Sequence, residues 1–224
     1  MIARRRAVSR RPGRERRSHG EQGAVLVEVV LVAPMLLVLC LGIFELGMML
    51  RGDIVIASST RSAARVGASS GDAPLADFEL LSAFGAAVSN VENATVNYVT
   101  VYQVTGSTST PPAACTTAAA ISAHGSAANS CNTYSGADLA AIMSNPAAAK
   151  ASFGGSCGGG GKDTKWCPSS RVNEQGAANG PDYLGVSTSV TVPTFTKLFG
   201  SSKTFTDAFV VRLDPSTLSN GGSP

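Results

Sequence analysis

The most prominent pattern in the chain is a long apolar run that follows a polar N-terminal segment. The run covers residues 25–50, VLVEVVLVAPMLLVLCLGIFELGMML, and its only charged side chains are Glu28 and Glu45. About 20 helical residues cross the hydrocarbon core of a bilayer, because each adds roughly 1.5 Å to the length of a helix. The pattern therefore predicts a transmembrane helix over residues 24–50.

Helical spacing of small and apolar side chains continues beyond this run, through residues 51–69. A cluster that contains Gly71 and Pro74 follows, and such clusters are typical of a helix end. A second, short helix is expected over residues 75–88. Residues 51–92 are therefore predicted to form a helical stalk.

Three segments further along the chain have the composition of β-strands, namely residues 94–105, 183–193 and 206–213. The first alternates two faces that both carry apolar side chains, so it is expected at the centre of a sheet. One face holds Val96, Tyr98, Thr100 and Tyr102, and the other holds Asn97, Val99, Val101 and Gln103. A long helix followed by these strands predicts an α+β fold, in which a small antiparallel sheet packs on the helix.

The first and second strands are separated by an insertion, residues 106–180, that is rich in Gly, Ser, Ala and Asn. This composition does not build a core unaided, so we expect a long insertion within an external sheet domain of residues 93–214. Residues 215–224 are expected to be a flexible tail.

The charge of the chain is concentrated at its N-terminus. Residues 1–23 contain eight arginines and two glutamates, a net charge of +6, whereas residues 24–224 carry a net charge of −3. A basic tail can bind nucleic acid, but one beside a long apolar run favours an orientation with the basic side in the cytoplasm. We therefore expect a cytoplasmic leader, a single span of the cytoplasmic membrane, an extracellular C-terminal domain and no nucleic-acid partner.

A secretory signal peptide is the competing interpretation of this N-terminus. Its apolar region usually has about 7 to 15 residues and ends at a small-residue cleavage site. Here the apolar run continues through Phe44, Leu46 and Met48 to Arg51 without an A-x-A sequence. The pattern therefore favours a helix that is retained.

The junction between leader and apolar run reads Gly23-Ala24-Val25-Leu26-Val27-Glu28. A glycine closes the leader, and a carboxylate is the fifth residue after it. The sequence resembles the cleavage site of type IV prepilins, a family in which a prepilin peptidase cuts after the glycine on the cytoplasmic side. The resemblance implies cleavage between Gly23 and Ala24, and a mature chain of 201 residues.

A carboxylate within the membrane needs a partner, because its burial at the bilayer centre costs about 2.5 to 3.5 kcal/mol. Cleavage would create a cationic α-amino group on Ala24, one helical turn from Glu28. Glu28 of the same chain or of a neighbouring subunit can pair with this group as helices bundle. The alternative is that Glu28 lies at headgroup depth and reaches water.

The resemblance becomes more specific along the helix. The stretch GAVLVEVVLVAPMLLVLCLGIFELG, followed by Ala63-Ala64-Arg65-Val66-Gly67-Ala68, resembles the TadE-like family of tight-adherence pilus assembly proteins. Members of that family are minor pilins or pseudopilins of a type IV-related secretion and adhesion system. Val29 follows Glu28 where the major pilins of these systems tend to have tyrosine, which favours a minor component. The implied partners are the prepilin peptidase and other pilins or pilus-assembly proteins.

Four of the five cysteines lie in the insertion, on the side expected to be external, where disulfides persist. Four cysteines allow three pairings, and we favour the local pairs Cys115 with Cys131 and Cys157 with Cys167. A zinc site is the alternative, but the sequence has no C-x-x-C pair, and His124 is the only histidine nearby. We therefore expect disulfides that staple loops, with no metal and no cofactor.

Other candidate chemistry is sparse. The glycine-rich run before Lys162 lacks the Ser or Thr of a phosphate-binding loop, and a hydrolase would need a polar cleft around His124, the one external histidine. Glu45 is expected at the outer interface of the membrane within reach of water, or in a subunit contact. The sequence thus predicts a structural pilus component that is not an enzyme; the alternative is an unprocessed, membrane-tethered extracellular binding domain.

Overall fold

The computed structural model describes residues 19–104, 110–125, 130–154, 157, 160–177, 179–197 and 200–215. The leader up to residue 18 and the tail from residue 216 lie outside the described residues, so the structure says nothing of either. The chain divides into two compact units, Met1–Ile43 and Phe44–Pro224, which are described separately below.

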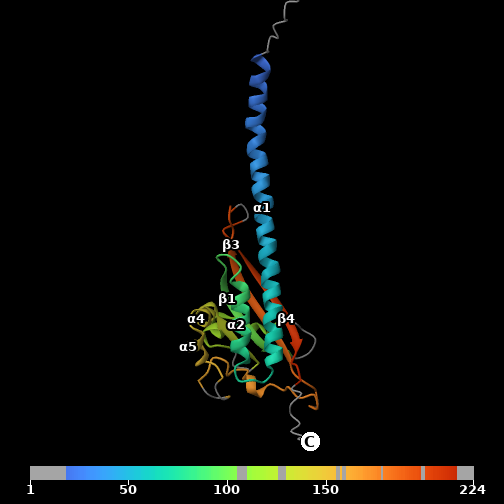
Figure 1. Cartoon of the computed structure of the whole chain (residues 1–224), viewed down its shortest axis with the longest axis vertical. Coiled ribbons are helices and arrows are strands. Elements are labelled where there is room, and N and C mark those ends of the chain that lie inside the picture. The colour runs from blue at the N-terminus through green and yellow to red at the C-terminus, as the bar shows by residue number, and fades with distance from the viewer. Residues whose placement is uncertain are drawn as a thin grey trace, which may run out of the picture. The chain divides into compact units, whose positions relative to one another are not determined.

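The described elements begin with one helix of 52 residues, α1 (His19–Ser70), which belongs to both units. The other elements lie in the second unit, called the head below (Figure 1). In chain order they are α2 (Ala76–Val88), β1 (Thr95–Gln103), η1 (Ala113–Cys115), α3 (Ala118–Ser122), β2 (Cys131–Ser135), α4 (Gly136–Ser144), α5 (Pro146–Lys150), η2 (Pro168–Ser170), β3 (Tyr183–Pro193) and β4 (Ser202–Arg212).

The strands form one antiparallel sheet in the order β2-β1-β3-β4. The structure confirms the α+β fold, and it confirms β1 as a central strand, paired with β2 on one side and β3 on the other. β3 has the predicted bounds, whereas β4 begins four residues earlier than the predicted strand over residues 206–213. The sequence predicted three strands, and the fourth, β2, lies within the insertion.

The predicted alternation of faces along β1 is wrong at its start. The pairing with β3 shifts by one residue between Val96 and Tyr98, which is a β-bulge. A bulge places two residues of one strand opposite a single partner and so changes which face the following side chains occupy. Val96 therefore packs against the same buried cluster as Val99 and Val101, not on the face that carries Tyr102.

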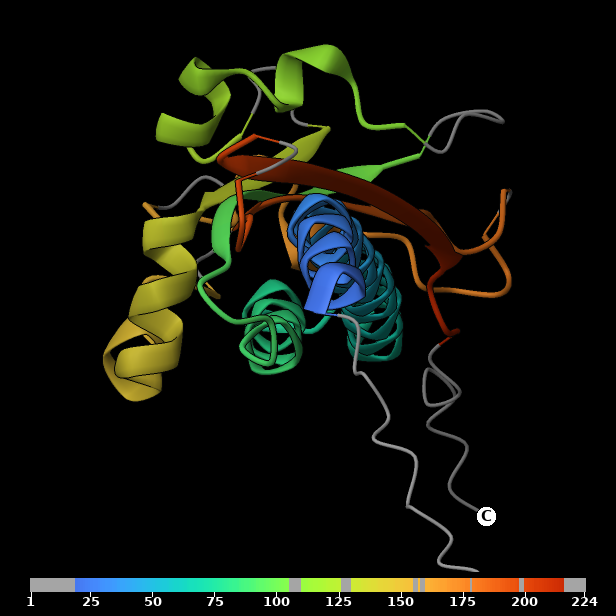
Figure 2. The ribbon, with the colours of Figure 1, turned by 90° about the horizontal axis from the view of Figure 1, so that it is seen from above.

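The main core of the head lies between the sheet and two helices. Figure 2 shows α1 and α2 side by side on one face of the sheet. Ile56, Ala63 and Ala64 of α1 are fully buried against apolar side chains of β3 such as Val186. Residues 51–92, predicted as a stalk, thus contain two helices that supply part of the core of the head.

Small side chains on α1 let the helix approach its neighbours closely. A Cβ added at Gly67 would lie 2.5 Å from Leu80 Cδ1 on α2 and 2.9 Å from Leu184 Cδ2 on β3. About two turns earlier, the buried hydroxyls of Thr60 and Thr188 are 2.8 Å apart and share a hydrogen bond between α1 and β3. α1 therefore packs closely against both the sheet and α2.

Because α1 approaches its neighbours closely at Gly67, alanine is expected to affect stability differently at two glycines of this helix. Gly67→Ala is expected to lower the free energy of unfolding by about 1 to 3 kcal/mol, because the added methyl group overpacks the core. Gly52→Ala is the matched control, since its nearest neighbour would be Phe205 Cε2 at 3.8 Å. That variant should be up to about 1 kcal/mol more stable, because alanine favours helix. Denaturation of both full-length variants in detergent measures the difference; equal stabilities would contradict the packing.

The insertion contributes more to the core than its composition predicted. Tyr134, Phe153 and Trp166 belong to the same buried cluster as Leu80 and Phe84 of α2. The short helix α4 begins with a capping box, in which Ser135 and Asp138 satisfy each other's backbone N–H groups. The insertion thus adds a few large side chains to a core that α1, α2 and the sheet also build.

A buried polar cluster, called the Asp77 cluster below, fixes the insertion to α2. Asp77 accepts hydrogen bonds from Arg171 Nη2 at 2.6 Å, Tyr134 Oη at 2.7 Å and Asn132 Nδ2 at 2.7 Å. The guanidinium carbon of Arg171 lies 4.3 Å from the ring centroid of Trp166. Burial, the charge of Asp77 and the hydrogen bond to Asp77 raise the pKa of the Tyr134 phenol well above its ordinary value, so it remains a donor. Charge and hydrogen bonds here compensate for the scarcity of apolar residues.

The structure contains two disulfides, Cys115–Cys131 and Cys157–Cys167, the pairs that the sequence favoured. The first joins η1 to β2 and packs with Tyr102, forming a second, smaller buried cluster. The ring of Tyr102 lies over Gly185 on β3, where an added Cβ would come within 2.3 Å of the ring. Burial raises the pKa of Tyr102 to about 12.

Candidate functional site

The most unusual surface of the first unit is the apolar part of α1. Every Val, Leu, Ile and Met side chain between Val25 and Ile43 is exposed, by 41% for Leu41 and up to 78% for Met35. Within the described residues, α1 is the one helix long and apolar enough to cross a membrane, and none of its most apolar stretch is buried. A helix that is apolar on all sides needs lipid or other helices around it. This surface is therefore built for a membrane or for helical partners.

The predicted processing junction lies inside α1, four residues from the helix start at His19. A Cβ added at Gly23 would meet nothing within 4 Å, so the packing of this chain does not require glycine there. Glu28 is exposed and lies one helical turn beyond Ala24, whose side chain is not among those described. The structure thus supplies an accessible glycine and an accessible carboxylate on one helix, without showing whether the chain is cut.

The surroundings of Glu45 differ from those that the sequence predicted. The expectation that water reaches it is wrong, because the residue is only 1% exposed and Thr196 donates its hydroxyl to Glu45 Oε2. The other oxygen, Oε1, is buried and has no hydrogen-bond partner among the described residues. A residue 151 positions away in sequence covers this carboxylate, which no local pattern could indicate.

The residue that covers Glu45 belongs to the connection between β3 and β4. We call residues 194–197 and 200–201, the described part of that connection, the β3–β4 tip. Its ends are joined by a hydrogen bond from Thr194 N to Ser201 O of 3.1 Å. Phe195 in the tip is 79% exposed, and its ring makes an edge-on contact with Phe44 of α1, with centroids 6.1 Å apart.

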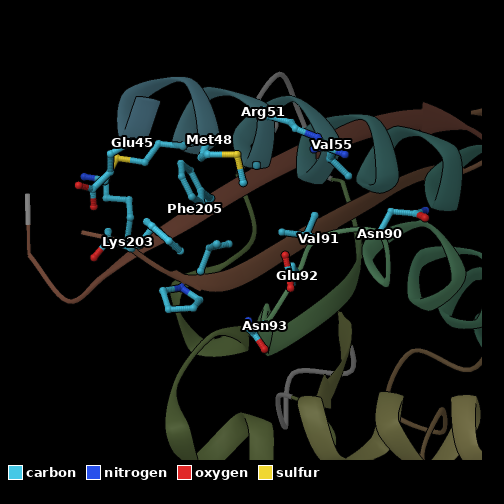
Figure 3. Close-up of a pocket in the computed structure, with 16 residues that line it drawn as sticks. Glu45, Met48, Arg51, Val55, Asn90, Val91, Glu92, Asn93, Lys203 and Phe205 are labelled. Carbon is cyan, nitrogen blue, oxygen red and sulfur yellow. The ribbon is translucent and has the colours of Figure 1, made fainter. Parts of the chain in front are cut away.

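Beside the tip, a pocket of about 390 Å³ lies between α1, β4 and the segment that joins α2 to β1. Among the lining residues labelled in Figure 3 are Met48 and Val55 of α1, Phe205 of β4 and Val91 of the joining segment. Its charged residues are Glu45, Arg51, Glu92 and Lys203. No group of three or more metal-binding side chains occurs within the part of the chain that the structure describes. The pocket is mainly apolar with charges of both signs, so its composition alone does not select a ligand.

The side chains around His124 do not make the hydrogen bonds that a hydrolase would need. His124 Nδ1 lies 3.6 Å from Asp138 Oδ2, and Ser135 donates its hydroxyl to that same oxygen, at 2.7 Å. The serine is thus held by Asp138 as the cap of α4, whereas a nucleophilic serine donates to the histidine. Burial alone would raise the pKa of Asp138, but hydrogen bonds from Lys162 and Ser135 outweigh it and hold the pKa below its ordinary value. This arrangement stabilises the start of a helix.

Comparison with known proteins links α1 to one family. The model of the family described as TadE-like protein matches residues 23–65, whereas no curated protein and no solved structure matches the chain. The matched segment begins at the junction glycine, includes Glu28 and Glu45, and ends in the part of α1 that packs in the head. The resemblance seen in the sequence is thus confirmed for residues 23–65, which are similar to the TadE-like family.

Proposed function

We propose that this chain is a minor pilin or pseudopilin of a tight-adherence pilus system. In this proposal it is made as a precursor, is cut after Gly23 by a prepilin peptidase, and is then held in the cytoplasmic membrane by α1. The observation that carries the proposal is the exposed apolar helix of α1 within a segment that matches the TadE-like family. The proposal assigns the protein a structural role in assembly and no catalytic activity.

The energy of membrane insertion supports this assignment. Residues 25–44 include 14 Val, Leu, Ile and Phe side chains. At roughly 0.3 to 0.6 kcal/mol each, they favour insertion by about 4 to 8 kcal/mol. One carboxylate costs about 2.5 to 3.5 kcal/mol at the bilayer centre, and less near its surface, where Glu28 would lie. Insertion therefore remains favourable with Glu28 unpaired, and pairing would add to it.

Glu28 gives the helix a second role, in addition to anchoring. After cleavage, the amino group of Ala24 and the carboxylate of Glu28 would be opposite charges in a medium of low dielectric, where their attraction is strong. A pair formed between neighbouring subunits would fix the axial register of their helices. We therefore propose that Glu28 guides the packing of α1 against the helices of other pilus components.

The charge of the leader and the cysteines support one orientation. The net charge of +6 on residues 1–23 favours a cytoplasmic N-terminus. The head would then face outward, where the two disulfides are stable. The same features would fit an unprocessed, tethered binding domain, so cleavage is the property that separates the two functions.

The deciding experiment is N-terminal sequencing of the membrane-bound protein, expressed with an active prepilin peptidase. We expect the wild-type chain to begin at Ala24 and Gly23→Val to keep its leader. Gly47→Val is the matched control, because an added Cβ at Gly47 also meets nothing within 4 Å on the same helix. It should begin at Ala24, as the wild type does.

Two outcomes would overturn the proposal. An intact Met1 in the wild type would favour the tethered binding domain. A start other than Ala24 would mean that a different peptidase acts, and that the resemblance at Gly23 has no consequence for processing.

A further inference from the structure

The β3–β4 tip combines features that the assembly function does not require. Phe195 is more exposed, at 79%, than any other large apolar side chain described outside α1, the next being Tyr183 at 47%. An aromatic ring so exposed at the end of a hairpin is less stable in water than against an apolar surface. Its one described ring contact is with Phe44, which belongs to the apolar run of α1.

The position of Phe44 along α1 indicates where that apolar surface lies. Counting from Val25, about 20 helical residues cross the hydrocarbon core, which ends the crossing near Phe44. Phe195 is in contact with Phe44, so the tip lies at the level where the helix leaves the bilayer. Aromatic rings are enriched at this level in membrane proteins, because the region is apolar on one side and wet on the other.

The charges at the tip complement the surface of a membrane. Lys197 in the tip and Lys203 near the start of β4 are both exposed. The tip itself has no acidic residue among those described, and the nearest acidic residue of α1, Glu45, is buried beneath Thr196. Lysines beside an anionic lipid surface strengthen membrane binding. The arrangement is an exposed aromatic ring flanked by two cations.

We propose that the β3–β4 tip is a second membrane contact, in which Phe195 enters the headgroup region of the leaflet where α1 emerges and Lys197 and Lys203 bind the phosphates of anionic lipids. The tip thereby holds the head against the bilayer at one point in addition to α1. This inference depends on α1 spanning a membrane, but it does not depend on cleavage after Gly23 or on a pilus.

The contact between Thr196 and Glu45 fits the same role. A carboxylate of the apolar run would otherwise meet lipid at the edge of the hydrocarbon core, at a cost in free energy. Thr196 covers Glu45 and donates a hydrogen bond to it. The side chains that face the lipid are then Phe195 of the tip and Phe44 of α1, and not a carboxylate. The tip removes an acidic group from the surface at which its own lysines would bind anionic lipid.

The test is the quenching of tryptophan fluorescence by lipids with brominated acyl chains, in the full-length protein reconstituted in phosphatidylglycerol bilayers. Phe195→Trp keeps an aromatic ring at the tip, and the one native tryptophan, Trp166, is 4% exposed and gives the background in the wild type. We expect the added emission of Phe195→Trp to be lost on bromination. Tyr183→Trp is the matched control, because Tyr183 is exposed at the opposite end of β3, and its added emission should remain.

A second arm tests the lysines. Lys197→Glu with Lys203→Glu, combined with Phe195→Trp, should reduce quenching in phosphatidylglycerol and leave the weaker quenching in phosphatidylcholine unchanged. If Phe195→Trp is quenched no more than Tyr183→Trp, the tip does not touch lipid, and its exposed ring is then free for a protein partner. If the lysine substitutions have no effect in phosphatidylglycerol, the assignment of anionic phosphate is wrong.

Discussion

Asp77→Ala is expected to destabilise the head by about 3 to 5 kcal/mol, which is the usual loss when one partner of a buried ion pair is removed. The side chains of Asp77 and Arg171 are both fully buried, and they are joined at 2.6 Å. The substitution would leave the guanidinium charge in the core without its counter-ion. It would also leave the donors of Tyr134 and Asn132 without this acceptor.

This loss is a large share of the free energy of a small domain, which is typically about 5 to 15 kcal/mol. Urea denaturation of the full-length protein in detergent, followed by circular dichroism, measures it. Lys162→Ala is the control, since Lys162 forms an ion pair with Asp138 while remaining 29% exposed. Partly exposed pairs contribute up to about 1 kcal/mol, so the control should lose little.

The double variant Asp77→Ala with Arg171→Met separates the cost of an unpaired charge from the loss of packing. Replacing both charged residues should recover part of the stability, because no buried charge remains. If Asp77→Ala lowers the free energy of unfolding no more than Lys162→Ala does, the Asp77 cluster does not hold the insertion in place. A double variant less stable than Asp77→Ala would show that the ion pair is not the source of the loss.

Removal of the Cys115–Cys131 disulfide is the second large effect, and the variant with both cysteines replaced by alanine is expected to lose about 3 kcal/mol. The bond closes a loop of 16 residues, for which the chain-entropy model gives about that value. Both cysteines are fully buried beside Tyr102, so the loss of two sulfur atoms also leaves the smaller cluster underpacked.

The Cys157–Cys167 disulfide supplies the comparison. It closes a loop of 10 residues, and Cys157 is exposed whereas Cys115 and Cys131 are not. We expect dithiothreitol to reduce this bond first, because a thiolate can reach its exposed sulfur. Alkylation at increasing reductant, followed by peptide mass mapping, reveals the order. Reduction of Cys115–Cys131 first would contradict the burial of the smaller cluster.

The parts of this protein that could be predicted from sequence are those set by local patterns. The apolar run and the helical spacing through residue 69 predicted most of α1, although the helix begins at His19 and not at residue 24. The alternation of β-branched residues predicted β3 with its observed bounds. The similarity to the TadE-like family over residues 23–65 could be recognised because its pattern lies within one helix. In each case the signal and the structure it predicts occupy the same stretch of chain.

β2 was missed because its burial does not follow from apolar composition. The strand reads CNTYS, and yet Asn132 and Thr133 are fully buried. Asn132 is stable there because it donates to Asp77 and to Trp166 O, and accepts from Trp166 N. Polar residues become core residues when their partners arrive from elsewhere in the fold, and no window of sequence contains those partners.

The same limit applies to Glu45 and the pocket. Glu45 was expected within reach of water because it interrupts an apolar run. That expectation considered only the helix and not the segments that pack on it. Its cover, Thr196, comes from a hairpin 151 residues later, and the walls of the pocket come from three separate segments. The charge of Glu45 was visible in the sequence, but its neighbours were set by tertiary packing.

The register of the central strands determines when the head can fold during synthesis. β1 pairs with β3 from Thr95 with Thr191 to Gln103 with Leu184, so the middle of the sheet joins residues more than 80 positions apart. Contacts of such long range close slowly, because the intervening loop must be ordered first. The sheet cannot be completed until nearly the whole chain has been released. Until then one edge of β1 is unpaired, and such an edge favours aggregation of the unfinished head.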